Sequence, residues 1–190
     1  MRNRVASLIR DVQGSALLEF AIALPLLVVF IVGIYDFSGA FNQKQKIEQA
    51  AQEGAIIAGA QPMSDIQSSN GNPDSLQTVV VAVFNSLAGS RVLPNANQVP
   101  CAPPGTASGP IGLAWTYKIS GCDPTHPDDL FIVVNRAVPS SGSPATVCTM
   151  GTVTYPYHYR GFNRVIQLLV PGASYGDPTL TESATVHNQL

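Results

Sequence analysis

An uncharged apolar run from Phe20 to Tyr35, FAIALPLLVVFIVGIY, constrains the fold of this sequence more than any other feature. As a helix rising 1.5 Å per residue the run spans about 24 Å, and counted from Ser15 it reaches about 31 Å, the thickness of the hydrocarbon core of a bilayer. We therefore expect one membrane crossing. Pro25 removes one backbone hydrogen bond inside the run, so we expect a kink or a local opening there rather than a break.

The flanks of this run predict its orientation. The first 13 residues are polar and basic, with Arg2, Arg4 and Arg10 against the single acidic residue Asp11. Because basic flanks are retained in the cytoplasm, we expect a cytoplasmic N-terminus. The predicted organisation is a cytoplasmic leader at 1–14, a transmembrane half-helix at 15–37 and an exported domain at 38–190.

Helical spacing continues beyond the apolar run, so the sequence predicts one long helix over about 15–60. Small residues recur at every fourth position in its outer half, which permits close approach of another backbone. That neighbour is either a helix of another subunit or the exported domain of the same chain. The two rows are Ala51, Ala55 and Gly59, and Ala50, Gly54 and Ala58.

The remainder predicts an α+β domain, a small antiparallel sheet on a helix. A helix is expected at about 74–87, a loop at 94–109, and a short helix or membrane-touching segment at 161–172. About four strands are expected, the third with Val153, Tyr155, Tyr157 and Tyr159 on one face and with Pro156 favouring a sheet edge or a bulge. Their ranges are 111–119, 130–138, 145–159 and 179–186.

Composition and motifs exclude several classes of function. A net charge of -2 with 12% charged residues provides no basic surface for nucleic acid. The sequence contains no catalytic motif, and we expect neither an enzyme nor a bound cofactor. His126, His158 and His187 have no ligand at metal spacing, and we interpret the acidic loop CDPTHPDD at 122–129 as solvated rather than as a calcium site, so no metal is expected.

Three cysteines, Cys101, Cys122 and Cys148, lie in the predicted exported part, and no two have C-x-x-C spacing. An odd number in an exported domain is typical of one disulfide plus a spare thiol. The pairing stays open.

The start of the long helix carries a distinctive pattern. A basic leader ends in Gly14, four residues follow, and then Glu19 and Phe20 precede the apolar run. This arrangement resembles a prepilin, and the sequence from Gly14 to Gly59 is similar to the TadE-like pseudopilins of the tight-adherence (Flp, type IVb) pilus system. The ending VTYPYHY, an apolar segment and LTESATV also resemble that family.

The resemblance implies a minor pilin that assists assembly of an adhesive pilus. A prepilin peptidase would cut between Gly14 and Ser15, with Glu19 and Phe20 as recognition and assembly residues. Implied partners are other pilins, the Tad assembly machinery of the inner membrane and the lipid bilayer. The implied location is the inner membrane, with the exported domain periplasmic or extracellular and the subunit incorporated into a pilus or priming it.

Other readings of the same residues remain open at this stage. Glu19 is alternatively a carboxylate that reaches the headgroup layer from a helix end. Ser38-Gly39-Ala40 offers small residues for ordinary signal peptidase, which would release a secreted binding domain. An uncleaved anchor displaying a binding domain is the third alternative.

Overall fold

The computed structural model describes residues 12–62, 64–65, 72–126, 128–139 and 147–188. Residues 1–11 of the expected leader and residues 145–146 of the third expected strand lie outside the described residues. The chain divides into two compact units, Met1–Gly39 with Tyr159–Gly176 and Ala40–His158 with Asp177–Leu190. The division into two units does not show where the transmembrane part of the helix ends. The predicted boundary at residue 37, between the transmembrane half-helix and the exported domain, therefore stays a prediction.

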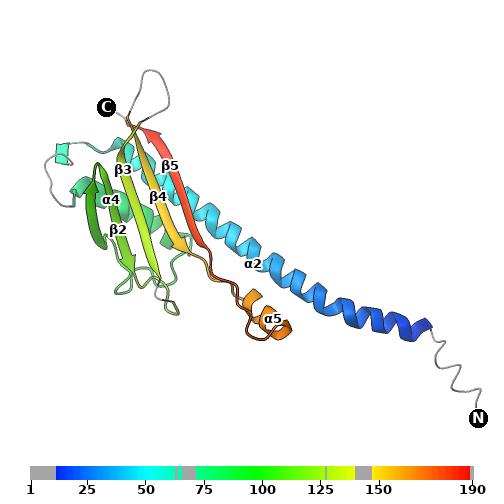
Figure 1. Ribbon diagram of the computed structural model, residues 1–190. Helices are drawn as coiled ribbons and strands as arrows, with labels where there is room; N and C mark the ends of the chain where they lie inside the picture. Colours follow the sequence, from blue (N-terminus) through cyan, green and yellow to red (C-terminus); the bar gives the residue numbers. More distant parts are fainter. Residues whose placement is uncertain (1–11, 63, 66–71, 127, 140–146, 189–190) are drawn as a thin grey trace, which may run out of the picture. The chain divides into compact units, whose positions relative to one another are not determined.

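One helix, α2 (Val12–Ala60), contributes to both units (Figure 1). It continues through Pro25 without a break, as expected, whereas the expected kink or local opening there stays a prediction. The predicted long helix is confirmed, beginning three residues earlier than expected.

The second unit contains one antiparallel sheet of five strands that follow one another in chain order across the sheet (Figure 1). The predicted α+β class is confirmed, with one strand more than the expected four. The strands are β1 (Thr106–Ile111), β2 (Ala114–Ser120), β3 (Asp129–Pro139), β4 (Val147–Pro156) and β5 (Thr179–His187).

The additional strand, β1, lies at a sheet edge and includes residues 106–109, which were expected to form a loop. It pairs with β2 from Thr106, opposite Lys118, and all its side chains are exposed. Because β1 buries no face, its sequence TASGPI lacks the apolar alternation from which a strand is recognised.

Strand β4 shows the alternation expected from its sequence, because Val153 and Tyr155 are buried on one face. Tyr157, one residue beyond the strand, is also buried, whereas Tyr159 is only partly buried. The expected edge or bulge at Pro156 is wrong: β4 lies between β3 and β5, and Pro156 is its last residue. The missing N–H therefore falls where the strand ends.

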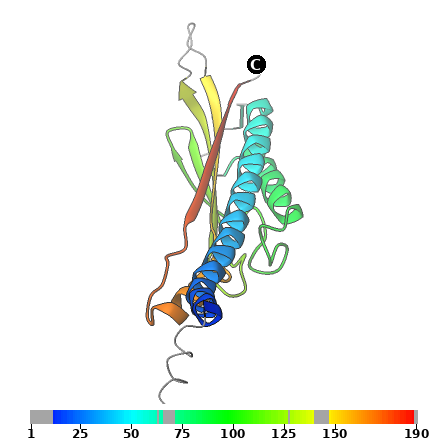
Figure 2. The ribbon, with the colours of Figure 1, turned by 90° about the vertical axis from the view of Figure 1, so that its right-hand side faces the viewer.

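Two helices cover the same face of the sheet within this unit, the part of α2 from Ala40 onward and α4 (Asp74–Gly89) (Figure 2). The helix expected at about 74–87 is confirmed, and the apolar residues on one face of α4 are fully buried. They are Leu76, Val79, Val80, Val83 and Leu87, with Phe84 added.

Both rows of small residues on α2 face the chain's own domain. A Cβ built on Gly54 would lie 2.5 Å from Cγ2 of Val83 in α4. A Cβ on Gly151 of β4 would lie 3.1 Å from the carbonyl oxygen of Ala51 and 3.2 Å from the nitrogen of Ala55. Gly59 approaches the β5 backbone, where a Cβ would lie 3.4 Å from the carbonyl oxygen of His187.

A buried arginine of β3 binds the C-terminal turn of α2. The Arg136 guanidinium donates through Nη1 to the carbonyl of Ala58 and through Nη2 to that of Gln61 at 3.0 Å. The last carbonyls of a helix have no partner inside it, and a cation there interacts favourably with the helix dipole. Burial lowers the pKa of Arg136, and the charge of Asp65 acts against that change.

We predict that Gly54→Leu destabilises the second unit by about 1–3 kcal/mol, because the new side chain meets Val83 in a filled core. Urea denaturation of the purified chain in detergent micelles measures the change. Gly89→Ala is the control, since a Cβ at Gly89 has no atom within 4 Å. Equal midpoints for Gly54→Leu and Gly89→Ala would contradict the close packing described above.

Candidate functional site

The first half of α2 presents apolar side chains on every side of the helix. Leu17 is 72% exposed, Phe20 62% and Phe30 70%. Within the part of the chain that the structure describes, α2 is the one helix that is long and apolar enough to cross a membrane. The helix is thus consistent with a single-pass membrane protein.

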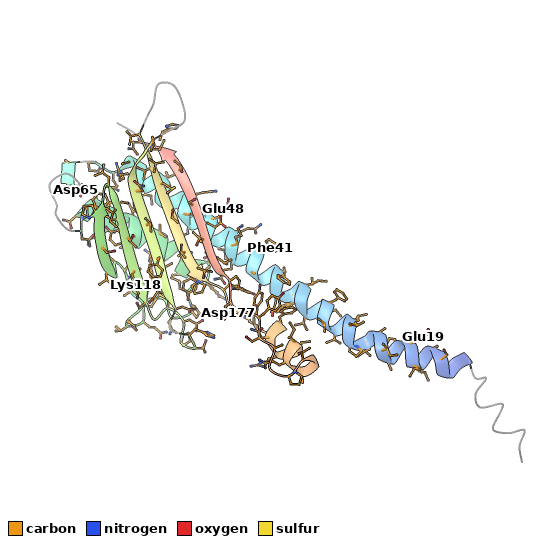
Figure 3. All side chains as sticks on the ribbon, viewed as in Figure 1. Glu19, Phe41, Glu48, Asp65, Lys118 and Asp177 are labelled. Carbon is orange, nitrogen blue, oxygen red and sulfur yellow. A yellow bond between two sulfur atoms is a disulfide. The ribbon has the colours of Figure 1, made fainter. Side chains whose placement is uncertain are left out.

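Near its start, α2 carries a carboxylate beside a hydroxyl. Ser15 Oγ donates to Glu19 Oε1 at 3.3 Å across one turn, and both side chains are exposed. Gly14 lies one residue before this pair, already inside the helix, and Phe20 follows it. Figure 3 labels Glu19 on this part of α2. Glu19 is the one charged residue between Ser15 and Tyr35.

A second carboxylate on α2, Asp36, binds the helix α5 (Phe162–Leu169) within the first unit. Asp36 is 1% exposed, and its Oδ2 accepts from the backbone nitrogens of Gly161 at 2.9 Å and Phe162 at 2.6 Å. The first N–H groups of a helix lack partners inside it, and a negative charge there is stabilised by the helix dipole. Asp36 therefore caps α5.

Aromatic rings surround this cap. The Phe37 and Phe162 ring centroids lie 5.8 Å apart, Phe37 also meets Tyr159 at 5.8 Å, and Phe162 meets Tyr175 edge-on at 5.4 Å. Asn163 joins the ends of this segment, since its Oδ1 accepts from the Tyr175 backbone at 2.8 Å. Segment 159–176 is thereby fixed on the last turns of the apolar run.

Sequence reasoning missed Asp36. The sequence feature that could have revealed it is a carboxylate directly after the uncharged run. If such a charge is buried, it must accept hydrogen bonds from another part of the chain. Its partners are 125 and 126 residues away along the chain, so the sequence alone did not identify them.

The cysteine pairing left open by the sequence is Cys101 with Cys122, and Cys148 is a buried free thiol. The disulfide joins the segment before β1 to the end of β2. The Cys148 sulfur lies 3.3 Å from Nδ1 of His187 in β5.

A cluster of histidines and aspartates lies in the second unit, where β2 ends, β3 begins and β5 begins. The His126 and His158 rings stack with centroids 3.6 Å apart and an 11° angle between planes. His158 contacts Asp128 through Nε2 and Asp177 through Nδ1 at 2.5 Å. Figure 3 labels Asp177 where the chain enters β5. We refer to Asp123, His126, Asp128, His158 and Asp177 as the His–Asp cluster.

The acidic side chains of the cluster raise the pKa of His158. Burial lowers the pKa of His158, but its hydrogen bonds to Asp128 and Asp177 outweigh burial and raise it above the usual value of 6.5. The sequence did not reveal this cluster because His126 and His158 are 32 positions apart. The antiparallel order of β3, β4 and β5 brings their ends together.

Comparison with known proteins identifies the N-terminal segment. Residues 14–55 match the model of the family described as TadE-like protein, which confirms the resemblance found in the N-terminal sequence and leaves that of the ending a prediction. The match covers less than a quarter of the chain and supports a protein associated with the Tad pilus. No curated protein matches, and no solved structure matches.

We predict that Asp36→Ala releases segment 159–176, because two N–H groups of α5 lose their acceptor at a cost of about 1–3 kcal/mol each. Hydrogen exchange of the purified chain measures the effect as faster exchange over 159–176 with unchanged exchange in β2 to β4. Glu48→Ala, which removes an exposed carboxylate on the same helix, is the control. Unchanged protection of 159–176 in Asp36→Ala would exclude a capping role.

Proposed function

We propose that this chain is a TadE-like minor pilin or pseudopilin, cut after Gly14 by a prepilin peptidase, that takes part in assembling a Tad-type pilus used in surface adhesion. The observation that carries the proposal is the match to the TadE-like model, which begins at Gly14, the last residue before the proposed cut. The exposed carboxylate of Glu19, the one charged residue between Ser15 and Tyr35, supports the same role.

Cleavage gives Glu19 a partner. Gly14 has no side chain to obstruct a peptidase, and the cut creates an α-amino group on Ser15, one helical turn from the Glu19 carboxylate. That carboxylate would pair with the amino group of a neighbouring subunit. Because a buried ion pair contributes little net stability but penalises wrong alignments, its role would be to set the register between subunits.

The exposed apolar surface of α2 supports a role in which the helix is first covered by lipid and later by other pilins. Before assembly, lipid would cover side chains such as Leu17 and Phe30, with the basic flank holding the N-terminus in the cytoplasm. In a filament, apolar helices of other pilins would replace the lipid. The partners in this scheme are the peptidase, other pilins, the inner-membrane assembly machinery and the bilayer.

The alternative of a secreted domain released by signal peptidase has less support. Residues 38–40 lie in the middle of α2, so a cut there would divide this helix. Cleavage there would also separate Asp36 from α5, which it caps.

We predict that the mature chain begins at Ser15 and that Gly14→Leu accumulates at full length. N-terminal sequencing of protein from membranes tests this: Phe41 would indicate signal peptidase, and Met1 an uncleaved anchor. Gly33→Leu, changed within the same helix but away from the cut, is the control for insertion. A Gly14→Leu chain cut normally would rule out a peptidase that requires glycine.

We predict that Glu19→Ala is cut normally but enters pili at least about tenfold less, because an unpaired partner of a buried ion pair costs about 3–5 kcal/mol. Quantitative immunoblots of sheared pili and of membranes measure the two pools. Glu48→Ala serves as the matched control, since Glu48 is an exposed glutamate of α2 beyond the apolar run. Normal piliation with Glu19→Ala would remove the register role while leaving the cleavage prediction intact.

A further inference from the structure

Two histidines of the His–Asp cluster come from separate segments and meet acidic side chains. Asp123, His126 and His158 each offer one ligand atom, and these atoms all lie within 4.8 Å of one another. Asp123 Oδ2 is 3.7 Å from Nδ1 of His126, and Asp128 contacts Nε2 of His158. This brings two imidazoles and two carboxylates together at one end of the sheet.

Two carboxylates of the cluster pair with side chains that are not permanently charged. Within the described residues, Asp123 and Asp128 form their ion pairs with histidines, not with lysine or arginine. Lys118 of the same sheet already forms an ion pair with Asp129, with its Nζ 2.8 Å from Oδ2. A bound cation would add positive charge beside these two carboxylates.

A buried hydroxyl gives independent evidence of a missing ligand. Tyr155 is 3% exposed, and within the described residues its hydroxyl has no hydrogen-bond partner. Burial first, and then the charges of Asp128 and Asp123, raise the pKa of Tyr155, which places this hydroxyl within electrostatic range of the cluster. Buried polar groups in proteins are nearly always paired, and a water molecule on a bound ion would pair this one.

We propose that Asp123, His126, Asp128 and His158 form a site for a divalent transition metal, with zinc as the expected ion. Imidazole nitrogen combined with carboxylate oxygen suits zinc, whereas calcium and magnesium prefer oxygen ligands alone. Asp177 would be an outer carboxylate, one that contacts a ligand rather than the metal. It hydrogen-bonds Nδ1 of His158, while Nε2 of the same ring faces Asp128. Such outer carboxylates orient the ring of a ligating histidine. The proposal does not depend on the role in pilus assembly.

The test uses the full chain in detergent micelles, stripped of metal with a chelator and returned to neutral buffer. We expect one zinc ion per chain by calorimetry and by metal analysis. At zinc concentrations about 100-fold above the dissociation constant, the Tm rises by about 5–10 °C. Millimolar calcium gives no such shift.

Variants locate the site. His126→Ala and His158→Ala abolish the stoichiometric binding, and Asp177→Asn weakens it by about 10–100-fold, as expected for an outer carboxylate. His187→Ala is the matched control: it removes a histidine beside Cys148, outside the cluster, and keeps full affinity. Circular dichroism of each metal-free variant verifies that it is folded, and His126→Ala or Asp177→Asn decides the question if His158→Ala does not fold.

Three results would overturn the proposal. The first is that the unmodified chain binds no stoichiometric zinc. The second is that zinc binding is unchanged in a variant that carries both His126→Ala and Asp177→Asn. The third is that His187→Ala abolishes zinc binding. Binding of calcium in place of zinc would likewise contradict the assigned ligand chemistry.

Discussion

The close approach of α2 to β4 is the contact on which the second unit depends. Gly151 removes the side chain that would otherwise meet the helix backbone at Ala51 and Ala55, and Gly54 does the same toward Val83 in α4. Without these glycines the helix could not lie at this distance from the sheet, since a core at native density leaves no room for added methylenes. The small-residue rows of α2 are therefore used inside the chain. Contacts with other subunits would have to come from other faces or from the exposed apolar half of the helix.

Two buried charges act by the same principle at opposite ends of helices. Asp36 accepts the first N–H groups of α5, where a negative charge is favoured, and Arg136 donates to the last carbonyls of α2, where a positive charge is favoured. Each charged side chain loses its hydrogen bonds to water on burial and makes hydrogen bonds to the backbone in their place. At the start of α5, the N-cap residue Gly161 supplies no side-chain hydrogen bond of its own. Asp36 and Arg136 are thus structural, in contrast to Glu19, whose exposed carboxylate remains available to a partner.

Periodicity explains which parts of the fold were predictable. The long helix, the buried face of α4 and the alternation in β4 each follow from residues that bury one face, and burial imposes a period on the sequence. Strand β1 buries no face and gave no signal. Pro156 was correctly seen as unable to donate within a ladder, but the inference to an edge failed because a strand can simply end at its proline. The pattern from Gly14 to Phe20 was recognisable because all its members are local.

By itself, the sequence determined the long helix, the single carboxylate between Ser15 and Tyr35, the candidate cleavage position and the α+β class, because each depends on residues close together in the chain. The tertiary structure alone decided the pairing of Cys101 with Cys122, the partners of Asp36 and Arg136, and the meeting of His126 with His158. These contacts join residues from 21 to 126 positions apart. No local pattern encodes them, since they follow from strand order and from how a helix lies on a sheet.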